Sequence, residues 1–555
     1  MEPAEPVNDA AAWRPLALLL AAGALLFFWR LGSNDLWPPD EARFALVARE
    51  MLERGDPILL SHNNHLYTEK PPLFFWAIGL CALPFGGVNE WAARLPSAAA
   101  SLLSLVLVYL LGSRLYDRRT GFLGAIVFAT ACQIAIRARW ASIDMLLNLL
   151  VLGAILLLWA AAGGGRTAAW RLRAAWVLMG LATLAKGPVG MVVPLLAVVT
   201  PLLLLRRFRA ARRAFQPSGI ALCLLVIGLW FVPFALRLGP LSALEVALHQ
   251  NVDRYVDAWN TRQPIWFYLW RFPAGFLPWS VFLPWGIAQV LAPEERPRRE
   301  AAVFLLAWIA AVLLFFSLST GKRGVYVIPA YPAAALVVGR LLSRSIESGT
   351  GGEPARRRLR PPLLAWTGMT VVLAAAAPIL ALRKESSLVP PAAAVAGCFL
   401  AGAVAAAWMQ ARGRHLKAVQ VLAGSHVLAC VLTVGLLVPW VDRHKRIRTF
   451  ATEVKARLHP AGEFGATQQK RDAWVFYTGR FAAVLDTPGS VEAFLGAAGP
   501  RDLLIEASEL RRVRDRLPPD AEVIWRGRVA GDEYYLLHRA GEAVSRPAAT
   551  AGGGT

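Results

Sequence analysis

The chain has 555 residues, 56% of them hydrophobic, and a mean hydropathy of +0.46. This composition excludes an ordinary soluble globular protein, and long charge-free runs of Leu, Ala and Val indicate several membrane-spanning helices. The formal charge is +22, but the arginines gather in short loops between apolar runs and no nucleic-acid-binding motif is present. We therefore assign the basic residues to membrane topology and expect no nucleic-acid partner.

Thirteen apolar segments predict transmembrane helices, because each is close to the length that crosses a bilayer. They cover residues 15–31, 93–112, 120–137, 143–163, 169–186, 187–205, 218–237, 274–292, 301–319, 325–343, 361–382, 388–410 and 417–440. Basic residues concentrate in alternate loops, which predicts a cytoplasmic N-terminus and an outer C-terminus. A further run, 73–85, is too short to span and would invert every basic loop if counted, so we expect it to lie along the outer surface.

The first long outer segment, residues 32–92, carries two motifs. In PPDEARFALVAREML, Asp40 and Glu41 precede a predicted amphipathic helix, and capping that helix is an equally good explanation for Asp40. We expect this helix to cover 41–53 and to turn four apolar side chains toward the membrane, namely Phe44, Val47, Met51 and Leu52. In YTEKPPLFFW, Glu69 and Lys70 stand before two prolines that fix the backbone direction. A snorkelling lysine with a counter-ion is the ordinary alternative there.

Charged residues also occur at the outer ends of later apolar segments. Asp144 begins one of them, where a carboxylate needs a partner, and Arg137 or Arg139 could supply it. A structural ion pair and a site residue both explain Asp144. Lys186, in LAKGPVG, is a cation in a similar position.

The second long outer segment, residues 238–273, contains HQNVDRYVDAWN. On a helix, His249 and Asp253 would be four residues apart, a spacing compatible with metal binding but weak on its own. Farther on, STGKRGVYVIPAYP places four polar residues at an outer edge, namely Lys322, Arg323, Tyr326 and Tyr331.

Together the outer face gathers acidic and basic side chains at the lipid–water boundary. The carboxylates are Asp40, Glu41, Glu69 and Asp144, and the cations are Arg43, Lys70, Lys186, Arg254 and Lys322. This combination favours a site that holds an anionic lipid headgroup beside an acidic catalytic group.

The chain after residue 440 changes character. We divide the protein into a membrane domain (1–440), an outer α/β domain (441–541) and a disordered tail (542–555). Within the α/β domain, helices are expected at 444–458, 490–498 and 509–517, and strands at 474–479, 481–486, 502–507, 522–527 and 533–539.

The four motifs PPDEARFALVAREML, YTEKPPLFFW, ASIDMLLN and KGPVG resemble those of polytopic transferases that use polyprenyl-phosphate-linked sugars. The likeness is greatest to the 4-amino-4-deoxy-L-arabinose transferases that modify lipid A, and protein O-mannosyltransferases are more distant. The resemblance implies an all-α, GT-C-type membrane fold of about 13 transmembrane helices with a small C-terminal α/β domain.

The resemblance also implies roles for individual residues. Asp40 would lie nearest the chemistry, with Asp144 and Glu41 as further acidic candidates. Glu69 and His249 would bind a divalent metal, with zinc as the implied ion. The carrier phosphate would be held by Lys70, Arg254 and Tyr326, with Arg43, Tyr67 and Asp144 lining the same cavity. We expect Arg43, Tyr67, Lys186 and Lys322 to take part in binding the carrier phosphate as well.

The implied reaction is inverting transfer of a sugar, 4-amino-4-deoxy-L-arabinose, from undecaprenyl phosphate to lipid A phosphate at the periplasmic face of a bacterial inner membrane. We expect a monomer that contacts membrane lipids. Two alternatives stay open: a protein O-glycosyltransferase with the same donor, and a flippase or transporter for lipid-linked sugars. A transporter needs polar residues through the membrane midplane, whereas the apolar runs here are largely uninterrupted.

Overall fold

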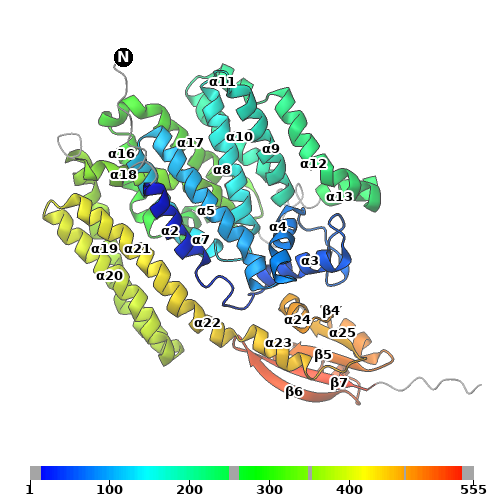
Figure 1. Cartoon of the computed structure of the whole chain (residues 1–555). Coiled ribbons are helices and arrows are strands. Elements are labelled where there is room, and N and C mark those ends of the chain that lie inside the picture. Colours follow the sequence, from blue (N-terminus) through cyan, green and yellow to red (C-terminus); the bar gives the residue numbers. More distant parts are fainter. Residues whose placement is uncertain (1–13, 249–261, 348–352, 468–469, 541–555) are drawn as a thin grey trace, which may run out of the picture.

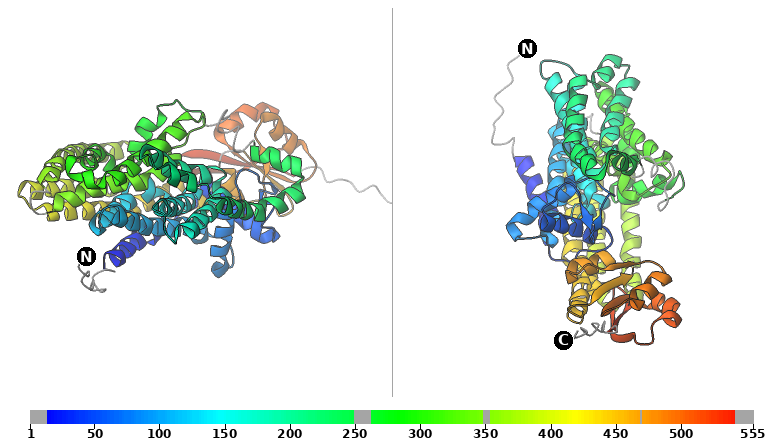
Figure 2. Two further views of the ribbon diagram at one scale, coloured as in Figure 1. Left: turned by 90° about the horizontal axis from the view of Figure 1, so that it is seen from above. Right: turned by 90° about the vertical axis from the view of Figure 1, so that its right-hand side faces the viewer.

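The computed structural model describes residues 14–248, 262–347, 353–467 and 470–540. Within these ranges the chain forms a body of helices followed by a small α/β domain (Figure 1). Three helices, α19, α20 and α21, pack side by side at one edge of the body, and the chain continues from α21 through α22 into the C-terminal domain. The views in Figure 2 show this domain at one end of the helices.

The predicted spans are helical. The long helices are α2 (Arg14–Phe28), α5 (Glu90–Leu115), α6 (Arg118–Thr130), α8 (Ile143–Ala162), α9 (Ala168–Lys186), α10 (Val189–Leu204), α12 (Pro217–Leu238), α17 (Arg299–Leu318), α18 (Tyr331–Ile346), α19 (Glu353–Lys384), α20 (Val389–Ala411) and α21 (His415–Leu432). In the described ranges, eight helical segments are long and apolar enough to cross a membrane. The chain is a polytopic membrane protein, while the number of thirteen spans stays a prediction.

Three predicted spans are interrupted. The segment 120–137 breaks at Ala131, whose extended backbone separates α6 from α7 (Cys132–Arg137). The segment 274–292 is divided among α15 (Phe267–Gly275), the 3₁₀ turn η3 (Trp279–Val281) and α16 (Leu283–Val290), and 325–343 begins in the 3₁₀ helix η5 (Gly324–Ala330). Prolines at 278, 284 and 329 lie in the last two segments, and each removes a backbone donor.

Four of the remaining helical elements lie between these spans: α11 (Phe208–Arg213), α13 (Pro240–Leu248), η4 (Pro293–Arg298) and η6 (Ser386–Leu388). The π-helical turn η7 (Thr433–Leu437) and α22 (Val438–Lys445) instead continue α21 through the end of the predicted span 417–440.

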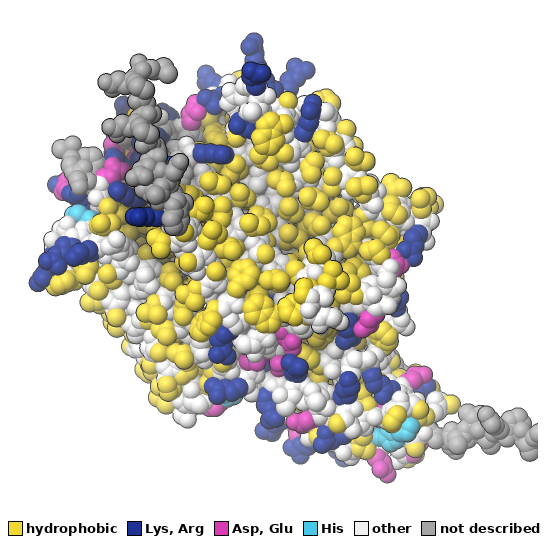
Figure 3. Space-filling model, viewed as in Figure 1, with side chains coloured by type: hydrophobic (Ala, Val, Ile, Leu, Met, Phe, Trp, Pro, Cys, Tyr) yellow, Lys and Arg dark blue, Asp and Glu magenta, His cyan; other side chains and the backbone are white. Residues whose placement is uncertain are grey.

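The basic loops predicted to share one membrane side do meet at one end. Arg340 of α18 donates to Asp117 before α6 at 2.6 Å and to Glu295 of η4 at 2.7 Å. Arg358 of α19 binds Glu294. We call this the arginine-rich end, and the opposite end the cavity end. Figure 3 shows cationic side chains at the top of the molecule, an apolar band across its middle, and further charges on the domain below.

The first outer segment covers part of the cavity end. It contains α3 (Asp40–Arg54), a hairpin of β1 (Ser61–His62) and β2 (His65–Leu66), α4 (Leu73–Ala82) and η1 (Leu83–Phe85). With ten residues, α4 is about 15 Å long, half the thickness of the hydrocarbon core. Phe44 packs edge-on against Phe74 and Phe75 of α4.

The expected orientation of the amphipathic helix is therefore wrong for three of its four apolar residues. Phe44, Val47 and Met51 are buried within the protein, and Leu52 alone is exposed. Helix α4 follows along the chain and covers the face that sequence reasoning assigned to lipid.

The C-terminal domain is built on a five-stranded mixed sheet of order β4-β3-β5-β7-β6. Its strands are β3 (Glu463–Thr467), β4 (Ala483–Leu485), β5 (Arg501–Glu506), β6 (Glu522–Val529) and β7 (Asp532–Arg539). Strand β3 pairs in parallel with β4 and β5, and β7 runs antiparallel to β5 and β6.

Helices cover both faces of this sheet. They are α23 (Ile447–Lys455), α24 (Arg471–Thr478), α25 (Pro488–Gly496), α26 (Ala507–Val513) and the 3₁₀ turn η8 (Arg514–Arg516). Phe450 of α23 and Trp474 of α24 continue the main core, while α25 and α26 enclose a smaller one. The strand predicted at 474–479 is instead part of α24, which ends at the left-handed Gly479, and β3 was missed.

Candidate functional site

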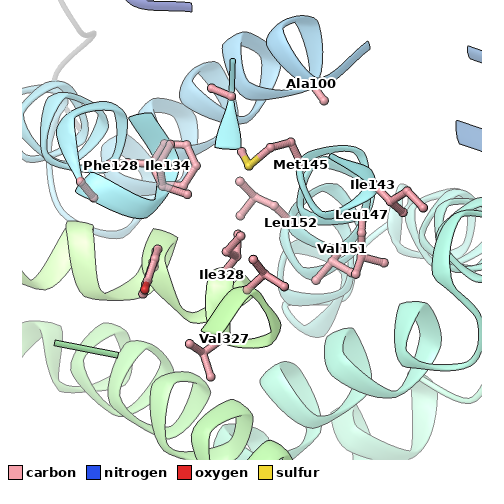
Figure 4. Close-up of a cluster of buried hydrophobic side chains, with 14 of the residues drawn as sticks. Ala100, Phe128, Ile134, Ile143, Met145, Leu147, Val151, Leu152, Val327 and Ile328 are labelled. Atoms are coloured by element: carbon pink, nitrogen blue, oxygen red, sulfur yellow. The ribbon is translucent and has the colours of Figure 1, made fainter. Parts of the chain in front are cut away.

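A cavity of about 670 Å³ opens at the cavity end of the helical body. Its walls come from the starts of α3, α8 and α10, the ends of α7 and α9, α15, α17 and η5. The floor is apolar: Ile143 and Leu147 line the cavity and belong to the buried cluster in Figure 4. The charged side chains in its lining are Asp40, Lys70, Arg137, Asp144, Lys186, Arg271 and Arg323.

The last residue of α9 and the first turn of α8 contribute an ion pair to this cavity. The ammonium of Lys186 binds the carboxylate of Asp144 and lies 4.8 Å from the ring centre of Tyr326. Of the two partners expected for Asp144, Arg139 is wrong, because its guanidinium donates to the backbone carbonyl oxygens of Leu26 and Trp29. Arg137, the other candidate, lines the same cavity as Asp144. Sequence spacing could not reveal a partner supplied by another helix.

Asp40 is the first residue of α3 and reaches the same cavity. One carboxylate oxygen lies 4.0 Å from the guanidinium of Arg323. Arg323 and Arg271 are cations that the sequence interpretation did not assign to the site. Arg323 follows Lys322 directly in the motif STGKRG, and the sequence alone does not show which of the two side chains faces the cavity.

Lys322 does not line the cavity. It is buried, and its ammonium donates to the carbonyl oxygens of Gln263, at 2.9 Å, and Ser319. Lys322 thus fastens the end of the second outer segment to the loop between α17 and η5.

Glu41 also lies outside the cavity, although it neighbours Asp40. Its carboxylate is 1% exposed, pairs with the Arg94 guanidinium at 2.7 Å and accepts from the backbone amides of Trp37 and Ala141. Because both of its oxygens already accept hydrogen bonds, this carboxylate holds the first outer segment to α5 and to the α7–α8 loop. Its position does not support the expected catalytic role.

A second, smaller cavity of about 260 Å³ adjoins the first and shares Lys70, Lys186 and Pro188 with it. Most of its lining is apolar, with Trp230, Phe231 and Phe234 of α12, and its polar lining includes Tyr67 and Glu69. Two lysines therefore lie where an apolar crevice meets a larger charged cavity.

Tyr67 lines the second cavity, whereas Arg43 lines neither cavity, against expectation, and pairs with Glu69 beside them. Burial, together with the charge of Glu69, raises the pKa of Tyr67 well above its ordinary value, so the phenol keeps its proton. Its hydroxyl has no hydrogen-bond partner among the described residues, which leaves it available to donate to a ligand. Burial lowers the pKa of Arg43, but Asp472 and Glu69 outweigh that effect and raise it.

The expected metal site has one described candidate ligand. Glu69 pairs with the Arg43 guanidinium at 3.2 Å, and no group of three or more His, Cys, Asp or Glu side chains within the described ranges is arranged to hold a metal ion. The described residues alone do not fit a metal. His249 and Arg254 both lie outside them, so the roles of these two residues stay predictions.

Known proteins are similar to this chain in sequence. A family model described as dolichyl-phosphate-mannose-protein mannosyltransferase matches residues 69–236, a range that includes Glu69, Lys70, Asp144 and Lys186. An undecaprenyl phosphate-α-4-amino-4-deoxy-L-arabinose arabinosyl transferase of Pseudomonas aeruginosa is 33% identical over 378 residues, which cover 66% of each chain. The corresponding protein of Pseudomonas paraeruginosa is 32% identical over 389 residues, 68% of this chain and 67% of the relative.

The chain belongs to this arabinosyl transferase family. It spans 66% of the length of the P. aeruginosa relative, just under two thirds. The fold is that of ArnT from Cupriavidus metallidurans, a member of known structure that was crystallised with undecaprenyl phosphate. The match has a TM-score of 0.79 at 23% identity and covers 95% of this chain and 98% of that one. The predicted fold class, a polytopic helical protein with a small C-terminal sheet domain, is confirmed.

Proposed function

We propose that the protein transfers 4-amino-4-deoxy-L-arabinose from undecaprenyl phosphate to a lipid A phosphate. The observation that carries this proposal is the paired cavity at the cavity end, where an apolar crevice and a charged chamber share Lys70 and Lys186. In this arrangement the donor phosphate lies at the two lysines, the isoprenoid chain occupies the crevice, and the sugar extends into the chamber.

The charge of the chamber fits a reaction between two phosphates. Its described lining holds five cations and two carboxylates, so it carries excess positive charge. A phosphate monoester acceptor carries about −1.5 to −2 charges near pH 7, and the donor phosphodiester carries one more. A neutral hydroxyl acceptor would leave the cations less well balanced.

Transfer forms one bond and breaks one. An acceptor phosphate oxygen attacks the anomeric carbon from the face opposite the carrier, and the bond from that carbon to the carrier oxygen breaks. Undecaprenyl phosphate leaves with one more negative charge, and the anomeric centre is inverted. Lys70 and Lys186 stabilise the charge that develops on the leaving oxygen.

Asp40 has a different task in this scheme. Because a phosphate acceptor is already ionised, no proton has to be removed during attack. The carboxylate then orients neighbouring groups and stabilises positive charge on the sugar ring, and Arg323 limits its movement. With a hydroxyl acceptor the same carboxylate would have to act as general base.

Orientation and metal content are part of the proposal. The arginine-rich end supports a cytoplasmic location for that end, which would place the cavities and the C-terminal domain in the periplasm of a bacterium. A zinc ion bound by Glu69 and His249 would act as a Lewis acid, but the reaction described here assigns it no step.

The direct test supplies purified protein in lipid nanodiscs with undecaprenyl phosphate-aminoarabinose and with either lipid A or total membrane protein as acceptor. We expect mass spectrometry to find the sugar on lipid A phosphate. The family model that matches residues 69–236 gives a reason to test protein acceptors as well. Sugar on protein and none on lipid A would establish the O-glycosyltransferase alternative, and donor translocation without transfer would establish a transporter.

A further inference from the structure

The C-terminal domain contributes one carboxylate to the network beside the cavities. Asp472, on the first turn of α24, has two occupied oxygens: one accepts from the Arg43 guanidinium at 3.1 Å and the other is 2.9 Å from the His62 ring. These partners are 429 and 410 positions away along the chain. The Asp472 side chain is only 12% exposed, so both contacts form in a largely dry interface.

The contacts continue from Arg43 to the lysine at the cavity junction. The guanidinium uses its Nε for Asp472 and one terminal nitrogen for Glu69, at 3.2 Å. The backbone oxygen of Glu69 accepts from the Lys70 ammonium at 2.9 Å. A short series of polar contacts therefore runs from α24 through Arg43 and Glu69 to Lys70.

Docking of the domain does not depend on Asp472 alone. The side-chain amide of Asn63 exchanges two hydrogen bonds with the backbone of Ala482, at 2.7 and 2.9 Å. The Tyr477 hydroxyl accepts from the amide of Leu36 at 2.7 Å, and Arg49 donates to the carbonyl oxygen of Phe476 at 2.7 Å. Since none of these three contacts involves Asp472, we expect the C-terminal domain to stay docked on the helical body when the charge of Asp472 is removed.

We propose that Asp472 is a positioning residue of the transferase: through Arg43 it fixes Glu69 and thereby the placement of Lys70 on the carrier phosphate. The inference rests on the proposed function for its kinetic part. A guanidinium held by two carboxylates has little freedom to rotate. With Asp472 neutral, Arg43 keeps Glu69 but loses the contact that sets its own orientation, and small displacements of a charged group in a site reduce rates strongly.

The kinetic test uses the full-length protein with four changes: Asp472→Asn, Asp472→Glu, Arg43→Gln and the Asp472→Asn/Arg43→Gln pair. Asp486→Asn is the matched control, because Asp486 pairs at 3.2 Å with Arg471, the neighbour of Asp472 on α24, and that pair is outside the network. Melting temperatures identify any variant that is simply unstable. An unstable Asp472→Asn would be replaced in the comparison by Asp472→Ser, which removes the same carboxylate.

We expect Asp472→Asn to lower kcat/KM for the lipid-linked donor about tenfold, with the acceptor KM unchanged. Asp472→Glu should recover most of the loss, and Asp486→Asn should match wild type. The double variant should be no slower than Arg43→Gln, because Asp472 acts through Arg43. Equal rates for Asp472→Asn and Asp486→Asn, or losses that multiply in the double variant, would overturn the proposal.

A second measurement separates this inference from the proposed reaction. Hydrogen–deuterium exchange of the unliganded protein should increase over residues 61–70 in Asp472→Asn and not in Asp486→Asn. If wild type transfers no aminoarabinose, the proposed function fails while this comparison still decides the positioning role. Equal exchange in the two variants would refute that role.

Discussion

The two ends of the helical body use the same residue types in opposite ways. At the arginine-rich end, Arg340 and Glu295 are each 1% exposed and bind one another, and Arg340 also binds Asp117. At the cavity end, Lys186 and Asp144 are paired but partly exposed, and Asp40 and Arg323 are 4.0 Å apart in the wall of a chamber. Charged residues at a membrane boundary indicate a binding site where they line a cavity with excess charge of one sign. They indicate a structural element where they are buried and each is paired with an opposite charge.

Breaking the buried pair gives the largest expected effect. Glu295→Ala leaves the Arg340 guanidinium without its bidentate partner in a dry environment. We expect the free energy of unfolding to fall by about 3–5 kcal/mol, measured by thermal or denaturant unfolding in detergent. Activity per folded molecule should stay near wild type. A stable variant with impaired transfer would mean that the comparison between the two ends is wrong.

Lys70→Ala makes the converse change at the cavity end. Removing a cation from the site of the leaving phosphate should reduce transfer by about 10²–10³ in rate, while the melting temperature and protein level stay normal. Initial rates with the lipid-linked donor provide the measurement. Arg357→Ala, which removes an exposed guanidinium at the arginine-rich end, is the control and should transfer normally. An active Lys70→Ala would remove the lysine from the proposed mechanism.

Asp40→Asn tests the acceptor chemistry and should have a smaller effect. If the acceptor is a phosphate, the loss should stay below about tenfold, since general-base catalysis usually contributes about 10²–10⁴ and is not needed here. Rates with lipid A provide the measurement. A loss near 10³ would show that a proton is removed by Asp40 and would favour a hydroxyl acceptor.

Acid should weaken the domain interface slightly. Burial raises the pKa of Asp472, but contacts with His62 and Arg43 outweigh burial and hold it below its usual range. A lowered pKa adds stability that is complete above the ordinary value of about 4 and is lost as pH falls through the native value. Exchange protection of residues 61–70 should fall below about pH 4 in wild type. In Asp472→Asn it should lack this Asp472-dependent step, and an identical profile would contradict the assignment.

Sequence reasoning was most successful for the helical body. A helix that crosses a bilayer needs a long apolar run, and its flanking arginines favour one side of the membrane, so these two patterns located the helices. They also predicted that 73–85 does not span, and the structure forms only a ten-residue helix, α4, there. The breaks within three predicted spans were missed, because an apolar residue such as Ala131 can leave the helical conformation without any change in the hydrophobicity of the sequence. The short helix α24 was mistaken for a strand because Trp, Val, Phe and Tyr favour strands.

The candidate site was only partly predictable, because its partners come from distant positions. Asp40, Lys70, Asp144, Lys186 and Tyr326 were predicted and do line one cavity. Glu41 has the same local signature as Asp40, yet Arg94, 53 positions away, removes it from the cavity. Asp472 belongs to a domain in which no catalytic motif is visible, so only the folded chain reveals its contact with Arg43.

The separation of 429 positions between Arg43 and Asp472 also has a consequence for biosynthesis. The first outer segment is synthesised long before α24, so Arg43 cannot pair with Asp472 until nearly the whole chain has been made. Contacts that close such long loops form late. With the proposed roles of Asp472 and Lys70, the order of synthesis leaves Lys70 imprecisely placed in every unfinished chain, and its position is set only once the chain is complete.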